Sequence, residues 1–151
     1  MDRPPANALN RELTEKLLAA LETARMDGAR AIVLTGRPGM FSGGLDVPEL
    51  LALDRRQMES FWSLFFGLTR QLAASPVPVI AAISGHAPAG GAVLALQCDW
   101  RIGVTGKFRI GLNEVQVGLP VPSTILVALE QVVGPRVARR MTGGTTAKPG
   151  F

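Results

Sequence analysis

The sequence predicts an α/β fold, in which parallel strands alternate with helices. Short β-branched runs such as 31–36 alternate with longer segments whose apolar residues recur at helical spacing. Two glycine-rich stretches, 42–44 and 90–91, each follow a strand and precede a helix, which is where open α/β sheets bind ligands. With 151 residues, of which 47% are hydrophobic, the chain is long enough for one domain with a sizeable core.

Periodicity and end signals predict the helices and strands in turn. Leucines at every fourth position from Leu9 to Leu21 mark the first helix, and Asn7 is placed to cap it. Ser123 is placed to cap a later helix, and Pro135 to begin the last one. The predicted helices cover 8–26, 55–74, 90–98, 123–133 and a segment from 135, and the predicted strands cover 31–36, 76–85, 100–104 and 107–112.

Composition and charge argue against several functional classes. No apolar run reaches the roughly 18 residues of a membrane span, and no basic-then-apolar leader is visible, so we expect a cytoplasmic chain with no membrane partner. The formal net charge of +4 comes from scattered residues in a chain with no tyrosine, which argues against nucleic acid. The basic cluster Arg136, Arg139 and Arg140 is interpreted first as a solvated helix face, and second as a partner for ligand phosphate.

The two glycine-rich loops suggest chemistry carried by the backbone. The stretch "PAGGAV" matches neither the dinucleotide-binding fingerprint nor the P-loop. Small residues at the start of a helix leave backbone N–H groups unpaired, and a free N–H from "SGGLD" would supply a second donor. Such a pair forms an oxyanion hole, in which one donor contributes about 10²–10³ in rate. A tight turn with close helix packing is the structural alternative.

Three motifs occur in order: "FSGGLD", "GHAPAGG" followed by "CDWRI", and "GLNEVQVGL". Together with "PPANALN" near the start, they resemble the crotonase (enoyl-CoA hydratase/isomerase) superfamily. The resemblance implies a crotonase-like ββα spiral core over 1–144, followed by a short polar tail over 145–151. It also implies that the family's first strands are missing, together with the C-terminal helical region that covers the acyl pocket, helps to bind CoA and builds the trimer.

The resemblance assigns roles to individual residues. The N–H groups of Leu45 and Gly90 would hold the thioester oxygen of an acyl-CoA as it becomes an enolate. The residues expected beside the substrate are Ser42, Gly43, Gly44, Ala89 and Gly91. Glu114 matches one of the two glutamates that hydratases of this superfamily use, whereas the other falls at Val93, which cannot transfer a proton.

A single carboxylate fits the movement of a double bond from C3–C4 to C2–C3, because one group removes a proton at C2 and delivers one at C4. Apolar neighbours of Glu114, namely Leu112, Val115 and Val117, would raise its pKa. We therefore expect Δ3-to-Δ2 enoyl-CoA isomerisation, with no cofactor beyond the CoA of the substrate. A full-length chain is expected to form a homo-oligomer, trimer or hexamer. A non-catalytic truncated fragment and an enoyl-CoA hydratase are the alternatives.

Other polar residues are assigned structural roles. His86 is the only histidine and has no cluster that would make it a metal ligand. We expect Asp46 to cap the next turn, Asp99 to hold the turn into "WRI", and Glu49 to have no role beyond the mouth of a pocket. Cys98 lies in an apolar run, where a buried structural thiol is expected.

Overall fold

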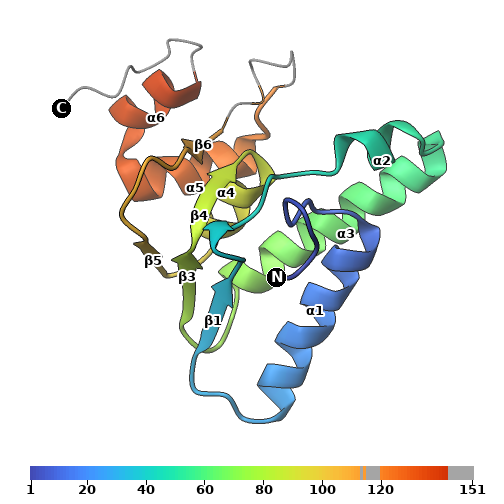
Figure 1. Cartoon of the computed structure of the whole chain (residues 1–151), viewed down its shortest axis with the longest axis horizontal. Helices are drawn as coiled ribbons and strands as arrows, with labels where there is room; N and C mark the ends of the chain where they lie inside the picture. Colours follow the sequence, from blue (N-terminus) through green and yellow to red (C-terminus); the bar gives the residue numbers. More distant parts are fainter. Residues whose placement is uncertain (113, 115–119, 143–151) are drawn as a thin grey trace.

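Two small parallel sheets organise the computed structural model, which describes residues 1–112, 114 and 120–142 (Figure 1). The first sheet contains, in spatial order, β1 (Ile32–Thr35), β3 (Val79–Ile83) and β5 (Trp100–Gly103). The second contains β2 (Gly39–Met40), β4 (Gly85–Pro88) and β6 (Ile110–Gly111). Successive strands alternate between the sheets and helices follow each pair, so the ββα spiral implied by the resemblance is confirmed.

The helices of the described residues pack around these sheets (Figure 1). They are α1 (Arg11–Met26), α2 (Val47–Leu51), α3 (Arg55–Ala73), α4 (Gly90–Leu96), α5 (Ser123–Val133) and α6 (Pro135–Thr142). Helix α1 lies along α3, and α4 contacts β4, β6, α3 and α5. The short helix α4 is therefore central, and its first residues are held by elements from distant parts of the chain.

The helix boundaries correct two capping predictions. Asn10, not Asn7, caps α1, because its side-chain oxygen accepts a 2.9 Å hydrogen bond from the amide of Leu13. Asn7 lies outside the helix, with φ +49°, and is completely buried. The N-cap of α5 is Pro122, and Ser123 is the first helical residue without a capping side-chain bond. Pro135 begins α6 as predicted.

Three short elements, β2, β4 and α2, were not predicted from the sequence. Strand β4 occupies a stretch expected to turn, and it pairs in parallel with β2. This pairing requires glycine at position 85, because a side chain there would collide with the backbone of Gly39. Asp46 precedes helix α2 and caps it, because its side chain accepts a 3.2 Å hydrogen bond from the amide of Glu49; the capping role predicted for Asp46 is confirmed.

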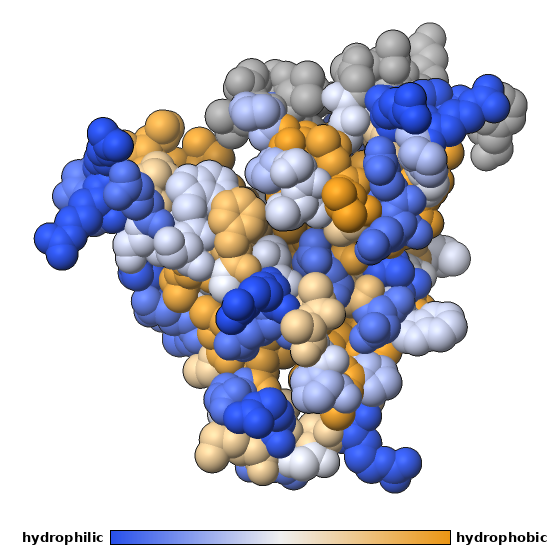
Figure 2. Space-filling model, turned by 180° about the vertical axis from the view of Figure 1, so that it is seen from behind, coloured by the Kyte–Doolittle hydropathy of each residue, from blue (hydrophilic) through white to orange (hydrophobic). Residues whose placement is uncertain are grey.

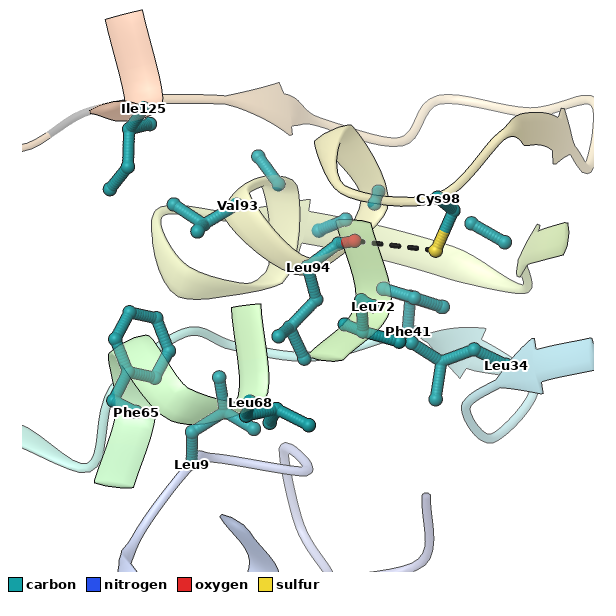
Figure 3. Close-up of a cluster of buried hydrophobic side chains, with 14 of the residues drawn as sticks. Leu9, Leu34, Phe41, Phe65, Leu68, Leu72, Val93, Leu94, Cys98 and Ile125 are labelled. Carbon is teal, nitrogen blue, oxygen red and sulfur yellow. Dashed lines mark hydrogen bonds between the residues drawn. The ribbon is translucent and has the colours of Figure 1, made fainter. Parts of the chain in front are cut away.

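The hydrophobic core lies between the first sheet, α3 and α4 (Figure 3). Helix α3 starts with a reciprocal capping box between Asp54 and Gln57, which fixes its first turn. The α3 side chains in the core recur at helical spacing: Phe61, Phe65, Leu68 and Leu72. Helix α4 is short and apolar, and it contributes Val93 and Leu94 from inside the fold.

Cys98 follows α4 and belongs to this core (Figure 3). It is 4% exposed, and its thiol donates a 3.3 Å hydrogen bond to the carbonyl of Leu94. Burial is the main reason why the pKa of the Cys98 thiol rises to about 12. The prediction of a buried structural thiol is confirmed.

The first sheet has one buried and one open face. Val79, Ala81 and Ile83 of β3 point into the core, whereas the alternate residues of that strand are only partly buried. On the same outer face, Val33 of β1 and Trp100 and Ile102 of β5 are 62%, 68% and 65% exposed. The open face is therefore strongly apolar.

Charged residues cover other parts of the surface and are interspersed with apolar side chains (Figure 2). Arg136, Arg139 and Arg140 are exposed on α6, in agreement with a solvated helix face. Within the described residues, no helix combines the length and the apolar character needed to cross a membrane.

Candidate active site

The loop between β2 and α2 leaves one backbone donor free. Six of the seven N–H groups from Phe41 to Val47 donate hydrogen bonds to described residues. Their acceptors are the carbonyls of His86 (from Phe41 and Ser42), Ala6, Leu9 and Leu45, and the Ser42 hydroxyl. The exception is Leu45, whose N–H has no acceptor among the residues that the structure describes.

The direction of the Leu45 amide follows from its bridge to Leu9. The amide of Leu9 donates to the carbonyl of Gly44 at 2.7 Å, and its carbonyl accepts from Asp46 at 3.0 Å. In an extended segment, successive peptide groups point to opposite sides. The N–H of Leu45 therefore points away from Leu9 and is available to a ligand.

The amide of Gly90 lies next to this free donor. A Cβ placed on Gly90 would be 3.3 Å from the Leu45 nitrogen. Since a Cβ is about 2.5 Å from its own nitrogen, the Leu45 and Gly90 nitrogens are within about 6 Å of each other. One oxygen atom that accepts two N–H bonds of about 2.9 Å requires a separation of that order. No described residue accepts a hydrogen bond from the Gly90 amide.

Ala89 sets the direction of the Gly90 amide. Its backbone has φ +45° and ψ −119°, a conformation that is strained for a residue with a side chain. Its own N–H donates a 2.8 Å hydrogen bond to the carbonyl of Gly111 at the end of β6. The peptide between Ala89 and Gly90 is therefore held in an unusual orientation by β6 and by the start of α4.

Glycines allow the two loops to meet. Gly44 has φ +89°, and a Cβ on it would lie 3.1 Å from both the Cβ of Ala89 and the nitrogen of Gly90. A Cβ on Gly91 would lie 2.5 Å from the carbonyl oxygen of Ser42. A Cβ on Gly43 would lie 3.1 Å from the Cβ of Ala6. The glycines of the "SGG" and "AGG" stretches thus let the two backbones pack closely and bring the two free N–H groups near each other.

Glu114 lies three residues after Gly111, the acceptor of the Ala89 amide. Its Oε2 atom is buried and has no hydrogen-bond partner among the described residues. Burial raises the pKa of the Glu114 carboxyl above the ordinary glutamate value, against a smaller lowering by its own backbone amide. Leu112 is buried beside it, whereas the other predicted neighbours, Val115 and Val117, lie outside the described residues.

Val93, at the position that the resemblance assigns to the first glutamate of hydratases, cannot exchange protons. It is 1% exposed and lies on the side of α4 that faces Ile125 of α5 (Figure 3). Both side chains are apolar, and Ile125 is itself buried. This part of the core therefore excludes water rather than presenting a second carboxylate.

The remaining predicted residues have structural partners. Ser42 is completely buried, with its hydroxyl bonded to the Asn7 carbonyl at 2.8 Å, and its placement beside the substrate stays a prediction. Nδ1 of His86 accepts a 3.1 Å hydrogen bond from the amide of Arg109. Asp99 accepts from the amide of Val79 at 2.8 Å, which ties the end of the α4 segment to the start of β3.

Glu49 belongs to a polar cluster beside the loop. It accepts a 2.8 Å hydrogen bond from Asn10, and Arg3 lies 3.4 Å from the same carboxylate. Arg3 also forms a 2.7 Å ion pair with Asp46. Sequence reasoning did not identify Arg3 as part of this region, although it lies immediately before the "PPANALN" signature.

An apolar hollow lies beside the first sheet, away from this site. No three His, Cys, Asp or Glu side chains of the described residues are grouped as a metal would require. A hollow of about 200 Å³ between α1, β1 and α3 is lined mostly by leucine and other apolar side chains, and none of the predicted site residues lines it.

The sequence of the chain is similar to those of known proteins. The family model described as Enoyl-CoA hydratase/isomerase matches residues 1–148. The chain belongs to the enoyl-CoA hydratase/isomerase family. Human mitochondrial enoyl-CoA delta isomerase 1 is 37% identical over 140 residues, which cover 91% of this chain and 46% of that protein. A probable enoyl-CoA hydratase of Mycobacterium avium is also 37% identical, over 93% of this chain and 55% of its own length.

Solved structures of the enoyl-CoA hydratase/isomerase family agree with the fold. Human mitochondrial Δ3-Δ2-enoyl-CoA isomerase superimposes with a TM-score of 0.89 at 35% identity, covering 93% of this chain and 56% of that chain. A probable enoyl-CoA hydratase of Mycobacterium tuberculosis has a TM-score of 0.89 at 31% identity, covering 95% and 61%. The chain spans about half the length of the curated relatives it matches. Isomerases and hydratases are both among these relatives.

Proposed function

We propose that this chain carries the catalytic centre of an enoyl-CoA isomerase, which moves a double bond from C3–C4 to C2–C3 of an acyl-CoA. The observation that carries the proposal is the free N–H of Leu45 beside the N–H of Gly90. The neighbouring amides of the loop are all paired, so this one donor is left available by the local structure. Two such donors stabilise the negative oxygen of a thioester enolate.

The first step uses Glu114 as a base. Its carboxylate removes a proton from C2 of a 3-enoyl-CoA, and the electron pair of that C–H bond moves toward the thioester carbonyl. The oxygen becomes the enolate oxygen, held by the amides of Leu45 and Gly90. Because burial raises the pKa of Glu114, the carboxylate is a stronger base than an ordinary glutamate.

The second step returns the proton. The carboxylic acid formed on Glu114 delivers a proton to C4, and the electron pair of the C3–C4 double bond forms the new C–H bond. The electron pair between C1 and C2 of the enolate then forms the C2–C3 double bond, and an electron pair of the enolate oxygen regenerates the thioester carbonyl. The product is an isomer of the substrate, and Glu114 is again ionised. One carboxylate is sufficient for both steps, which agrees with the valine at position 93.

Enoyl-CoA hydration is the second candidate, because probable hydratases are as similar to this chain as an isomerase is. Hydration adds water across the double bond, and a second group that orients the water favours it. Val93 and Ile125 offer no such group. A non-catalytic role is the third candidate, since the chain spans about half of its relatives.

The deciding experiment gives the chain a 2-enoyl-CoA and a 3-enoyl-CoA in separate reactions and analyses the products by mass and by ultraviolet absorbance. Isomerisation leaves the mass unchanged and creates the absorbance of the conjugated thioester, whereas hydration adds the mass of water. We expect isomerisation of the 3-enoyl-CoA to be the faster reaction. Faster hydration would contradict the isomerase proposal, and no product from either substrate would favour the non-catalytic alternative.

A further inference from the structure

Asn7 is a buried polar residue that the proposed reaction does not use directly. It is completely inaccessible to solvent, as is Ser42, to which its backbone is bonded. Burying polar groups is unfavourable unless they are fully hydrogen-bonded. The hydrogen bonds of Asn7 therefore indicate what its position contributes.

The side chain of Asn7 connects the N-terminal segment to the β2–α2 loop. Its amide nitrogen donates to the carbonyls of Met40 and Phe41, both at 3.2 Å. Its side-chain oxygen accepts from the amide of Arg3 at 2.7 Å. The left-handed backbone of Asn7, at φ +49°, is one that asparagine adopts more readily than most residues with a side chain.

The backbone of Asn7 continues this network toward the free donor. Its carbonyl accepts from the Ser42 hydroxyl at 2.8 Å, and the same hydroxyl oxygen accepts from the amide of Gly44 at 3.2 Å. The neighbouring Ala6 carbonyl accepts from the amide of Gly43 at 2.7 Å. These bonds end one residue before Leu45, whose own amide is left free.

We infer that Asn7 is a positioning residue, which holds residues 40–44 so that the N–H of Leu45 is fixed beside the N–H of Gly90. This inference rests on the proposed function for its effect on catalysis, but its structural part concerns the loop alone. Preorganised donors stabilise a developing charge without reorganising during the reaction. A loop released from Asn7 would lose that preorganisation while the core remains folded.

The test uses Asn7→Gly, which keeps the left-handed backbone accessible and removes all three side-chain hydrogen bonds. A milder second variant, Ser42→Ala, removes only the hydroxyl bridge between Asn7 and Gly44. The matched control is Thr14→Val, since Thr14 is also completely buried and its hydroxyl donates to the Asn10 carbonyl at 2.7 Å, within the first turn of α1 and with no direct bond to residues 40–44. Amide hydrogen exchange is measured on each free chain.

In Asn7→Gly, we expect the amides of Gly43 and Gly44 to exchange at least about 10-fold faster than in the parent. In Ser42→Ala, we expect the same increase for the amide of Gly44. The amide of Phe65 in α3 should stay as protected as in the parent in both variants. Thr14→Val should leave both loop glycines unchanged. Unchanged exchange at Gly43 and Gly44 in Asn7→Gly, or unchanged Gly44 in Ser42→Ala, overturns the inference. This readout needs no substrate.

The catalytic part is read from isomerisation of a 3-enoyl-CoA. We expect kcat to fall at least about 10-fold in both variants with a smaller change in KM, because a misplaced oxyanion donor affects the transition state most. Thr14→Val should lower the melting temperature about as much as the two loop variants do, but leave kcat unchanged. The loss of kcat in the loop variants would then not be a result of general destabilisation. A parent chain that gives no product contradicts the proposed function, whereas the exchange result still decides the role of Asn7. Parent-like kcat in a variant whose loop exchanges faster overturns the inference.

Discussion

A Cβ added to Gly90 would lie 3.3 Å from the amide nitrogen of Leu45 and 3.2 Å from the Cδ1 atom of Leu9. Both distances are shorter than ordinary van der Waals contacts of a methyl group, so Leu9 and the loop at Leu45 must move by a few tenths of an ångström to admit a side chain at position 90. The φ angle of Gly90 is not in the left-handed region, so the constraint on this position is steric and not backbone strain.

Gly90→Ala should therefore reduce kcat/KM for a 3-enoyl-CoA by about 10²–10³, the effect of losing one oxyanion donor. The reason is displacement of the Leu45 amide by the added methyl group. The control is Gly67→Ala in α3, where a Cβ would meet nothing within 4 Å. That variant should keep full activity and gain about 0.5–1 kcal/mol of stability. Parent-like kinetics of Gly90→Ala would remove this pair of amides from the mechanism.

Glu114→Gln should lower kcat for isomerisation by at least about 10²–10⁴, because the amide keeps the shape of the carboxyl group and cannot carry the proton. Steady-state rates with a 3-enoyl-CoA measure this, and circular dichroism checks the fold. Glu130→Gln is the matched control, since Glu130 is exposed on α5. Near-normal turnover of Glu114→Gln would mean that another group moves the proton.

The raised pKa of Glu114 also predicts how stability depends on pH. The folded chain holds the Glu114 proton more tightly than the unfolded chain, because burial disfavours the carboxylate. Unfolding therefore releases a proton between the ordinary glutamate pKa and the raised one, and the free energy of unfolding falls as pH rises through that window. The stabilising contribution of the protonated group is present below the window and lost above it.

Thermal melts test this linkage. The difference in melting temperature between Glu114→Gln and the parent should become more favourable to the variant from about pH 4 to about pH 7. Glu130→Gln, on the exposed side of α5, should show no such trend. A difference that is constant with pH, or that moves in the opposite direction, would contradict the burial of Glu114.

Reaction choice can be tested at position 93. Val93→Glu places a carboxylate where the resemblance puts the first glutamate of hydratases, and Val93→Gln is its uncharged control. We expect the ratio of hydration to isomerisation to rise at least about 10-fold in Val93→Glu, because a second base can deprotonate water. Both variants should be less stable, since position 93 is only 1% exposed. An unchanged ratio in a folded Val93→Glu would show that Val93 does not determine the reaction.

The open face of the first sheet predicts self-association. Val33, Trp100 and Ile102 form an apolar surface that water contacts at a free-energy cost. Light scattering should show that the parent self-associates, and the parent should bind a hydrophobic dye. The double variant Trp100→Lys and Ile102→Lys should self-associate less and bind less dye. Met26→Lys is the control, because Met26 is 75% exposed on α1. A monodisperse parent that melts cooperatively and binds no dye would contradict this prediction.

Sequence reasoning predicted the long helices, the strands of the first sheet and the ββα order, because periodicity and the family motifs are local signals. It placed the cap of α1 on Asn7 because the helical pattern of leucines already includes Leu9, and only the bond from the Leu13 amide identifies Asn10 as the cap. Strand β2 has only two residues, too few for an alternating pattern to be visible, whereas the equally short β6 lies within the strand predicted over 107–112.

The site was predicted less completely than the fold. The motifs suggested Leu45, Gly90 and Glu114 as site residues, which stays a prediction, but no local pattern shows which amide in a loop is free. That property depends on partners such as Ala6, Leu9 and His86, which lie more than thirty residues away in the sequence. The role of Asn7 was missed for the same reason, since its partners Met40 and Phe41 are equally distant in the chain.

Because Cys98 is buried, its reaction with a thiol reagent can be used to follow unfolding of this chain. It is the only cysteine, it is 4% exposed, and its pKa of about 12 leaves almost no thiolate at neutral pH. A thiol-reactive reagent therefore labels the chain only when the core around α4 opens. The labelling rate in the native state then measures how often the scaffold beneath Gly90 comes apart, without any engineered probe.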